Sequence, residues 1–538
     1  MAATEIDAPV LIVGGSLVGM SAAVLLGHHG VRPLLVEHHR GTAIHPRAAL
    51  VHERTMEILR EIGLERAVVE KSEEQFEQDG AVVGVESLGG RELAAYIPNI
   101  NTGVAAVSPC RRFFVTQMGL EPLLQARARE LGADLRFATE MVSFDETPDG
   151  IAAIIRHRDT GETAIVRAPY MIAADGAHSR IRERLGIAMQ GRGSFSRSAT
   201  IYFRADVNRL LRGRNLSIIM VTNRALNGFF RFEKPYHSGF LAVHAVGDPD
   251  RPDTDVSTGL TSERCRELVH AALGDDDLPV EIENVMPWEA AANVATRFRS
   301  GRVLLAGDAA HVMPPYGGFG GNTGIADAHN LAWKLAMVLQ GRAGPHLLDS
   351  YEAERQPVAR FTTEQAYSRY VVRAARYLAP GGMAALEPDL NIELGHVYRS
   401  TAVAADAEDG GAGHISPLDS KGRPGTRAPH LFLERGGERL STLDLFGRGF
   451  TWLAGPDGPA APALDGIDAY RIAPGGDLGD PDRSFPSSYG VSARGAVLVR
   501  PDGVVCWHSR RNESMTPGVL DRLLSRPSHG EDSSARRP

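Results

Sequence analysis

Short apolar runs alternate with glycine-rich turns and helix-like stretches at the beginning of the chain. The apolar run Val10–Val13 precedes Gly14–Gly19 (GGSLVG), a helix-like stretch follows at 20–29, and an apolar strand at 32–36 ends at Glu37. This order of strand, glycine turn, helix, strand and acid predicts a βαβ unit that binds a dinucleotide. Ser16 occupies the place of the second glycine in the usual fingerprint, so the turn alone is also compatible with an ordinary glycine-rich turn.

Further along the chain, the hydrophobic pattern predicts both helices and strands. Strands are expected at 133–144, 170–174 and 303–306, a hairpin at 151–158 and 163–168, and helices at 123–131, 327–340 and 350–378. Alternating segments at 199–205 and 239–246 predict an antiparallel sheet. The pattern therefore indicates an α/β domain into which a sheet domain is inserted.

Changes in this pattern predict the domain boundaries. Residues 1–75, 102–186 and 290–400 form a Rossmann-like domain with a long C-terminal helix, and residues 76–101 and 187–289 form the inserted domain. Gly, Asp, Ala and Pro are frequent at 403–428, which favours a linker at 401–428. A small α/β domain at 429–524 and a disordered polar tail at 525–538 complete the prediction.

The composition is that of a globular protein with a large core, because 43% of the residues are apolar and 23% are charged. A net charge of −8 gives no electrostatic reason to expect binding to nucleic acid. Cys110, Cys265 and Cys506 form no CxxC or metal-ligand pattern, so we expect reduced thiols, no metal site and a cytoplasmic location. No uncharged apolar run reaches the roughly 18 residues of a membrane span, so we expect no membrane association.

Two further motifs accompany the βαβ unit. The sequence Asp175-Gly176, followed by Ser179 and Arg182, comes after one apolar strand, and Gly307-Asp308 comes after another. Asp308 is thus expected at the carboxyl end of a strand, where open α/β sheets bind ligands. A glycine-rich stretch at 317–321 precedes a predicted helix and would present backbone N–H groups at its start.

The three motifs, in this order and spacing, resemble those of the group A flavoprotein monooxygenases, which have the para-hydroxybenzoate hydroxylase fold. The flanking segments 333–336 (WKLA) and 351–355 (YEAER) add to the resemblance, which covers about residues 8–400. Segments 45–48 (HPRA) and 54–57 (RTME) are similar to those of the bacterial aromatic polyketide hydroxylases of the tetracenomycin and aklavinone type. In that branch the C-terminal domain is thioredoxin-like. Here it lacks a CxxC motif, which makes thiol redox chemistry unexpected.

The resemblance implies a set of residues that hold FAD. Gly14, Gly15, Ser16, Leu17, Val18 and Gly19 would bind the pyrophosphate, and Glu37, followed by His38, the adenosine ribose. Arg47 and Gln117 would face the ribityl or phosphate region, and Met141 would lie near the adenine. The remaining implied contacts to FAD are Asp175, Gly307, Asp308, Pro315, Gly318, Gly320, Gly321 and Asn322. Of these, Asp308 would hydrogen-bond a ribityl hydroxyl, and Asp175 would also contact the nicotinamide.

The resemblance further implies the reaction. NADPH, for which the chain carries no second fingerprint, would bind transiently and reduce FAD, and a C4a-hydroperoxide formed with O2 would hydroxylate a polycyclic aromatic polyketide. Baeyer–Villiger oxygen insertion or epoxidation of a polyketide, and a flavin oxidase, are the alternatives. A nicotinamide dehydrogenase would leave the second and third motifs unexplained. The sequence does not decide between NADPH and NADH as the reductant. It also does not decide between a monomer and a homodimer.

The residues around the substrate are predicted less directly. Pro315, Tyr316 and Arg373 are the catalytic candidates, and Tyr202, Phe230, His244, Tyr316 and Arg373 the substrate contacts. The residues of the inserted sheet could equally be ordinary sheet packing. Arg369, Arg373 and Arg376 have helical spacing, which is also typical of a solvated stripe. His311 is expected to be structural.

Overall fold

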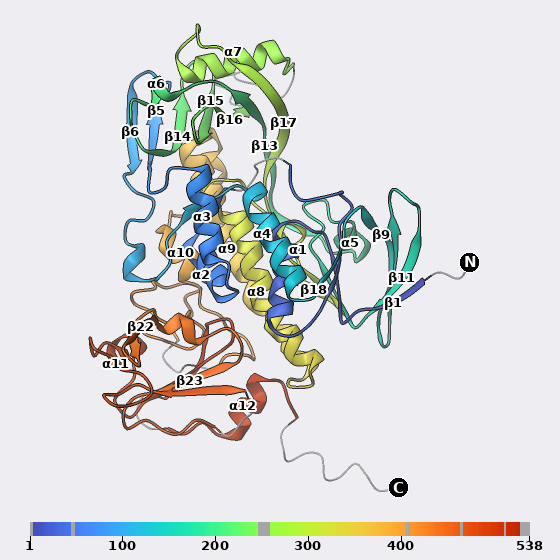
Figure 1. Cartoon of the computed structure of the whole chain (residues 1–538), viewed down its shortest axis with the longest axis vertical. Coiled ribbons are helices and arrows are strands. Elements are labelled where there is room, and N and C mark those ends of the chain that lie inside the picture. The colour runs from blue at the N-terminus through green and yellow to red at the C-terminus, as the bar shows by residue number, and fades with distance from the viewer. Residues whose placement is uncertain are drawn as a thin grey trace.

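The computed structural model describes residues 4–44, 49–245, 259–404, 406, 409–462, 466–509 and 513–527. In the described residues, four β-sheets of four or more strands carry the fold (Figure 1). Figure 1 shows one sheet at the top beneath α7, a small sheet at the right near the N-terminus, and the C-terminal domain at the bottom. The predicted positions Arg47, Val246 and 528–538 lie outside the described residues.

A six-stranded sheet forms the centre of the first domain. Its order is β18 (Arg299–Ser300), β19 (Val303–Leu305), β12 (Tyr170–Ala173), β2 (Val10–Val13), β3 (Leu34–Val36) and β8 (Asp134–Arg136). All neighbours from β19 to β8 are parallel, and β18 is antiparallel to β19. Strands β2, β3, β12 and β19 are buried throughout, as expected for a parallel sheet covered on both faces.

Helices pack against this sheet and against one another. They are α1 (Leu17–His28), α2 (Glu53–Glu61), α3 (Glu65–Gln75), α4 (Gln117–Glu130), α5 (Arg180–Arg184), α8 (Phe319–Leu339), α9 (Asp349–Arg373) and α10 (Asp389–Leu394). Leu25 and Leu26 of α1 and Leu331 and Leu335 of α8 belong to one buried core with the sheet. The long helix α9 ends at Arg373 and not near Leu378 as predicted, because the chain turns at Ala375 into the 3-10 segment Arg376–Gly381.

An eight-stranded sheet forms the inserted domain. Its order is β20 (His311–Val312), β17 (Glu281–Ala295), β13 (Met189–Arg204), β16 (Ser238–Ala245), β15 (Asn227–Glu233), β14 (Leu216–Thr222), β5 (Ala81–Val85) and β6 (Glu92–Ile97). Helices α6 (Asn208–Leu211) and α7 (Ser262–Leu273) contribute to the buried core on one face, with Leu268 of α7 packed among Ile201, Phe203 and Phe230. Because side chains alternate along a strand, Tyr202 and Phe229 lie on the other face.

A third sheet and several short elements complete the N-terminal part. The sheet has the order β1 (Thr4–Asp7), β11 (Thr163–Ala168), β10 (Gly150–His157) and β9 (Thr139–Thr147). The antiparallel pairing of β10 with β11 confirms the predicted hairpin. Strands β4 (Leu50–Val51) and β7 (Phe113–Phe114) pair with each other, and short 3-10 segments lie at Val104–Ala106, Gly307–Ala309 and Pro345–Leu348.

The C-terminal domain has a four-stranded sheet of the order β24 (Ile467–Arg471), β23 (Phe450–Ala454), β25 (Ala496–Val499) and β26 (Val505–Ser509). Strands β23 and β24 are parallel, and the other two pairs are antiparallel. The hairpin of β21 (Phe432–Arg435) and β22 (Glu438–Ser441), the 3-10 segment Thr442–Leu445, α11 (Phe485–Tyr489) and α12 (Pro517–Leu523) surround it. Trp333 and Met337 of α8 share a core with Phe450 and Trp452 of β23, so the domain packs directly on the first domain.

The segment predicted as a linker is fixed in place over its described residues. Val397 bridges to Thr426, and Arg427 bridges to Val504. The Arg427 guanidinium also donates to the Glu57 carboxylate of α2, with Nε 2.9 Å from Oε2. The linker prediction rested on the glycine and proline content, and composition does not report such contacts. None of the helices among the described residues combines the length and apolar composition needed to cross a membrane.

Candidate active site

The first motif forms the turn between β2 and α1. Gly14 has φ +106°, and a Cβ at this position would lie 2.2 Å from the Ala174 carbonyl oxygen, so the turn requires glycine. The Glu37 carboxylate, at the end of β3, accepts hydrogen bonds from the Gly15 N–H at 2.6 Å and the His39 N–H at 2.8 Å. The acid predicted for the ribose is therefore buried and held directly beside the glycine turn.

Ser16 belongs to a polar cluster at the same turn. Its hydroxyl donates to Oε1 of Glu121 at 2.8 Å and accepts from Nε2 of Gln117 at 2.8 Å. The other oxygen of Glu121 accepts the Ala43 N–H at 2.6 Å. Gln117 thus contacts the turn through Ser16, and its contact to FAD stays a prediction, whereas Glu121 was missed. Its position four residues after Gln117, on the same face of α4, is the signal that could have indicated it.

Residues of the second motif hydrogen-bond to one another and so fix the loop that follows β12. One oxygen of Asp175 accepts from the Ser179 hydroxyl at 2.6 Å, and the other accepts from the Ile181 N–H at 3.3 Å. Burial raises the pKa of Asp175. Arg182 donates to the Ala177 and Ala309 carbonyls, both at 3.1 Å. The arginine of the second motif therefore joins this loop to the third motif.

The third motif lies at the carboxyl end of β19 and leads to the start of α8. Asp308 is exposed between the buried Gly307 and Ala309. Gly318 precedes α8 with φ +70°, where a Cβ would lie 3.1 Å from the Leu50 Cβ. The Asn322 side-chain amide donates to the Leu50 and Gly318 carbonyls, at 2.8 and 2.7 Å. Its predicted contact to FAD would therefore be made by its backbone N–H.

The helix starts at both glycine motifs fit a dinucleotide. Neither α1, which begins after Ser16, nor α8, which begins after Gly318, has a side-chain cap from any described residue. The first N–H groups of a helix lack intrahelical acceptors and favour anionic or carbonyl oxygens. Gly320 and Gly321 lie in this first turn of α8, and Leu17, Val18 and Gly19 lie in that of α1. The residues present therefore fit FAD, with Glu37 and Asp308 at separate strand ends.

A buried ionic cluster contacts the third motif at Gly307. Asp327 of α8 accepts from the Gly307 N–H at 3.1 Å, contacts Nε2 of His311 at 2.8 Å and pairs with Nε of Arg355 at 2.7 Å. The Arg355 guanidinium and the contact with His311 outweigh burial and keep the pKa of Asp327 below its usual value. His311 is therefore structural, as expected.

Tyr316 connects the third motif to the inserted sheet. Its hydroxyl lies 2.8 Å from Nε2 of His244, whose Nδ1 lies 3.3 Å from the Ser198 hydroxyl. The Tyr316 ring also packs edge-on against Tyr370, with 5.3 Å between centroids. Burial lowers the pKa of His244 to about 4 and raises that of Tyr316, so both side chains are neutral near pH 7. The two candidates predicted separately are thus one hydrogen-bonded pair.

Phe230 is a correction to the predicted substrate contacts. It lies in the core on the α7 face, with its ring centroid 6.2 Å from that of Phe203. The adjacent Phe229 faces Tyr316 and His244 instead, at 6.3 and 6.0 Å. Tyr202 lies on this second face, 6.2 Å from Phe240. The alternation of the strand was recognised, but the sequence does not say which of two neighbouring phenylalanines points toward α7.

The three arginines of the predicted stripe have different surroundings. Arg369 is buried and donates to Asp389 at 2.6 Å, so it is structural and not solvated. Arg376 lies beyond the end of α9 and is exposed. Arg373, at the last turn of α9, is half-buried, and burial lowers its pKa. Among the described residues it forms no ion pair, although Tyr316 and Asp389 are close enough to act on its charge.

The other predicted contacts are spread around these motifs. Pro315 is exposed beside the buried Tyr316, and Met141 of β9 packs against the main core. His38 is exposed next to Glu37. The side chains of Glu37, His38 and His39 lie within 4.8 Å of one another, but the carboxylate already accepts two backbone N–H groups. Arg47 lies outside the described residues.

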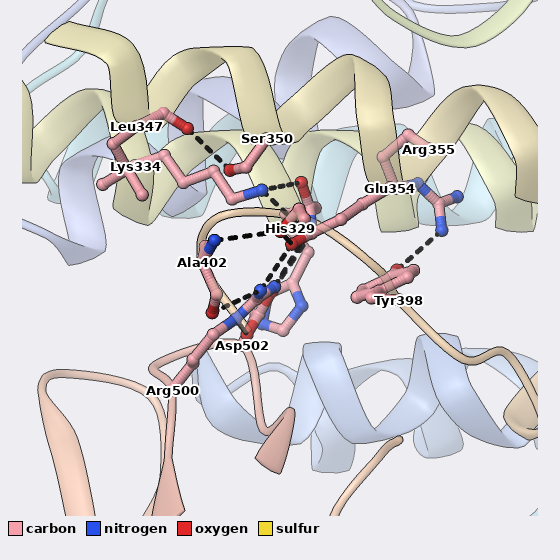
Figure 2. Close-up of polar contacts among 12 residues, drawn as sticks. His329, Lys334, Leu347, Ser350, Glu354, Arg355, Tyr398, Ala402, Arg500 and Asp502 are labelled. Atoms are coloured by element: carbon pink, nitrogen blue, oxygen red, sulfur yellow. Dashed lines mark hydrogen bonds and ion pairs between the residues drawn. The ribbon is translucent and has the colours of Figure 1, made fainter. Parts of the chain in front are cut away.

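The two flanking segments of the sequence analysis hold the domains together. Glu354 of α9 accepts from Lys334 of α8 at 2.8 Å and from both terminal nitrogens of Arg500, at 2.6 and 2.9 Å (Figure 2). Asp502 pairs with the same guanidinium at 2.5 Å. Burial acts to raise the pKa of Glu354, but Arg500 and Lys334 hold it well below its usual range. Trp333 and Glu354 thus contact the C-terminal domain, and Lys334 pairs with Glu354 from the side of the first domain.

Two family models match the chain. The model described as "FAD binding domain" matches residues 7–366, and "Aromatic-ring hydroxylase, C-terminal" matches residues 421–527.

Similar proteins extend over nearly the whole chain. A 4-methyl-5-nitrocatechol 5-monooxygenase of Burkholderia sp. is 49% identical, covering 94% of this chain and 95% of its own length. A tetracenomycin A2 monooxygenase-dioxygenase of Streptomyces glaucescens is 40% identical, covering 97% and 98%. A crystal structure of aklavinone-11 hydroxylase with FAD and aklavinone superposes with a TM-score of 0.90 at 37% identity, over 98% of this chain and 100% of that one.

Proposed function

The chain belongs to the FAD-binding aromatic-ring hydroxylases, and from this premise we propose that it uses NADPH and O2 to hydroxylate a polycyclic aromatic polyketide. It is a flavin-dependent aromatic monooxygenase, and FAD is its cofactor. The contact that carries the proposal is the hydrogen bond from Tyr316, in the third motif, to His244, in the inserted sheet. It brings a polar pair beside aromatic side chains next to the predicted flavin site.

FAD supplies the oxygen-activating chemistry when it is bound and reduced. In this proposal the N–H groups at the start of α1 hold the pyrophosphate, Glu37 the ribose and Asp308 the ribityl chain. The N–H groups of Gly321 and Asn322 hold a carbonyl oxygen of the flavin ring. Asp175, Gly307, Pro315, Gly318 and Gly320 shape the backbone around it.

The Tyr316–His244 pair orients the phenol of the substrate. Neutral His244 accepts a hydrogen bond from the Tyr316 hydroxyl at Nε2, which leaves the tyrosine oxygen free to accept a hydrogen bond from a substrate hydroxyl. The positive charge of Arg373 stabilises negative charge that develops on that hydroxyl oxygen. Tyr202 and Phe229 supply aromatic surface on the same face of the sheet. Phe229 replaces Phe230 in this role.

A second candidate substrate is a single-ring nitrocatechol. The Burkholderia relative, whose name states this substrate, is 49% identical, against 40% for the tetracenomycin relative. Both candidates would present a phenol hydroxyl to the same face. Baeyer–Villiger oxygen insertion or epoxidation is the alternative chemistry, and NMR distinguishes its products from hydroxylated phenols.

The C-terminal domain is proposed to be thioredoxin-like. The strand order β24-β23-β25-β26 with one parallel pair supports this, and its buried Cys506 has no CxxC partner in the sequence. We assign it a packing role, in a monomer or a homodimer located in the cytoplasm.

Anaerobic stopped-flow reduction of the holoenzyme by NADPH tests the function. We expect aklavinone or 4-methyl-5-nitrocatechol to accelerate flavin reduction, and the ligand that does so to gain one oxygen atom in air. Acceleration by the nitrocatechol alone would favour the second candidate. No reduction by NADPH with or without ligand would contradict the proposed reaction, and reduction by NADH alone would correct the nucleotide.

Asp308→Ala tests the assigned cofactor contact. Loss of a hydrogen bond to a charged group costs about 1.5–3 kcal/mol, so FAD should bind roughly tenfold to hundredfold more weakly. The flavin absorbance of the protein after gel filtration measures this. Asp276→Ala, in the exposed loop after α7, serves as the control. A fully flavinated Asp308→Ala protein would remove the assignment.

A further inference from the structure

Arg231 of β15 is a buried cation between two aromatic rings. Its residue exposure is 6%, and its Cζ lies 3.8 Å from the ring centroid of Phe76 and 3.6 Å from that of Phe114. Along β15 it alternates with Phe230 and Phe232, which are in the core on the α7 face. The guanidinium therefore belongs to the same face of the sheet as Phe229, whose ring packs near Tyr316.

The guanidinium has no protein acceptor among the described residues: it forms no hydrogen bond and no ion pair there. Burial lowers the pKa of Arg231 well below its usual value, and Glu233 on the same strand is the one charge that opposes this. The guanidinium nitrogens are not fully enclosed by protein atoms, so a group from outside can still reach them. Buried arginines are ordinarily paired, because an unpaired ion loses its hydration without compensation.

The geometry of the guanidinium limits what kind of group it can bind. The Phe76 and Phe114 rings, at 62° to each other, both approach Cζ, and the N–H groups lie along the edge of the guanidinium plane. Such an edge binds two adjacent oxygen atoms through two parallel hydrogen bonds, which a lysine ammonium does not reproduce. A negative charge on those oxygens would compensate the buried positive charge.

The position of Arg231 relates it to the predicted flavin site. Phe76 and Phe114 form one cluster with the half-buried Leu50 packed on it. Leu50 is the residue that faces Gly318 and accepts from Asn322 at the start of α8. Ile218 packs both on this cluster and on the cluster that contains Tyr316 and Tyr370. Arg231 thus lies between the third motif and the aromatic face of the sheet.

We propose that Arg231 binds the substrate through two neighbouring, partly ionised ring oxygens, such as a catecholate or a phenolate beside a carbonyl. The inference rests on the proposed function and narrows its substrate class to phenols that carry such a pair. A reduced flavin presents similar anionic chemistry. The substrate is favoured because Arg231 is a residue of the sheet and shares its face with Phe229.

Equilibrium binding to the oxidised holoenzyme tests the proposal without turnover. The probe is 4-methyl-5-nitrocatechol, because the absorbance of a nitrophenol reports its ionisation. We expect the wild-type enzyme to bind the ionised form and to lower the apparent pKa of the bound phenol by about 1–2 pH units. Other titratable groups lie on this face or next to it, namely Tyr202, Glu233, His244, Tyr316, Tyr370 and Arg373, so the titration is repeated with the dimethyl ether of the probe, which cannot ionise.

Arg231→Met should weaken binding of the ionised probe roughly tenfold to hundredfold and abolish the shift in its apparent pKa. Arg231→Lys should restore part of the affinity, since it keeps the charge and loses the two-pronged edge. Affinity for the dimethyl ether should change little in either variant. Arg439→Met is the matched control, because Arg439 also stacks on a phenylalanine at 3.6 Å but is exposed in the C-terminal domain.

Several results would overturn the proposal. Unchanged affinity of Arg231→Met for the ionised probe would do so. A shifted flavin reduction potential with unchanged affinity would assign Arg231 to the flavin, and a large drop in melting temperature would assign it to structure. If the wild type binds neither this probe nor aklavinone in ionised form, the proposal is wrong. Arg231-dependent binding without hydroxylation would instead contradict only the proposed function.

Discussion

Arg500 in the C-terminal domain and Arg231 in the inserted sheet are both buried and both stack on aromatic rings, but their polar surroundings differ. Arg500 lies 5.1 Å from the Trp333 ring and donates to both oxygens of Glu354 and to Asp502 (Figure 2). Arg231 lies between Phe76 and Phe114 and meets no carboxylate among the described residues. Arg500 therefore has its counter-ions within the protein, whereas Arg231 has none among the residues that the structure describes.

This difference teaches how to separate structural charges from binding charges. A buried ion whose partners all come from the protein contributes to domain packing, and its removal leaves other ions unpaired. A buried ion without protein partners destabilises the free protein and gains its partner from a ligand. Replacing Arg500 should therefore lower the free energy of unfolding more than it weakens ligand binding. Replacing Arg231 should weaken ligand binding more than it changes the free energy of unfolding.

The largest effect is expected for Arg500→Met. The substitution leaves the buried carboxylates of Glu354 and Asp502 without their main cation, so the free energy of unfolding should fall by about 3–5 kcal/mol. Urea unfolding followed by circular dichroism measures the change. Arg435→Met, at an exposed arginine of the same domain, is the control. A loss below about 1 kcal/mol would show that the cluster does not hold the domains together.

His244 gives a smaller, pH-dependent effect. Its pKa is lowered by burial to about 4, whereas an unfolded chain protonates histidine near 6.5. Between these values the unfolded state binds more protons, so stability is lost as the pH falls from about 6.5 to 4, by up to about 3 kcal/mol from this group. In His244→Gln that part of the slope should disappear. Unfolding at pH 7, 6 and 5 measures it, and identical slopes in both proteins would refute the burial argument. The exposed His346→Gln is the control.

Ser16→Ala tests the polar cluster of Ser16, Gln117 and Glu121, for which we expect modest effects on both stability and FAD binding. The substitution removes one donor to Glu121 and one acceptor for Gln117, at the edge of the predicted FAD site. We expect a loss of about 1 kcal/mol of stability and less than tenfold weaker FAD binding. Thermal unfolding and flavin titration measure the two effects. A complete loss of FAD would mean that the hydroxyl itself binds the pyrophosphate.

The smallest effect on stability is expected for Arg231→Met. Loss of the stacking is offset by removal of an unpaired buried charge, so the free energy of unfolding in the absence of ligand should change by less than about 1 kcal/mol. Denaturant unfolding compares it directly with Arg500→Met. Equal losses in the two variants would remove the distinction between the regions.

Most of the fold could be predicted from local patterns. Runs such as Val10–Val13 and the hairpin of β10 with β11 were found, because burial and turn chemistry act over a few residues. The end of α9 was misplaced, since the turn at Ala375 leaves no strong local signal. The segment 401–428 was predicted as a linker because composition does not reveal that Arg427 pairs with Glu57.

The candidate site divides in the same way. Gly14, Glu37 and Gln117 meet at one turn, and the family matches confirm FAD as the cofactor, while the contact of each residue to FAD stays a prediction. Phe230 was placed on the wrong face because one residue of register decides it. The pairing of Tyr316 with His244 and the isolation of Arg231 could not be predicted, since each depends on residues from different sheets or distant segments.

The sequence by itself determined the α/β class, the glycine motifs and the family, because these follow from short-range sterics and from spacing along the chain. Only the tertiary structure decided which buried charges find partners. Glu354 and Arg500 are 146 positions apart in sequence, and their pairing depends on how two domains pack. The same packing leaves Arg231 beside two rings with no carboxylate partner in the described part of the chain, and the energy of a buried ion is set by such three-dimensional neighbours.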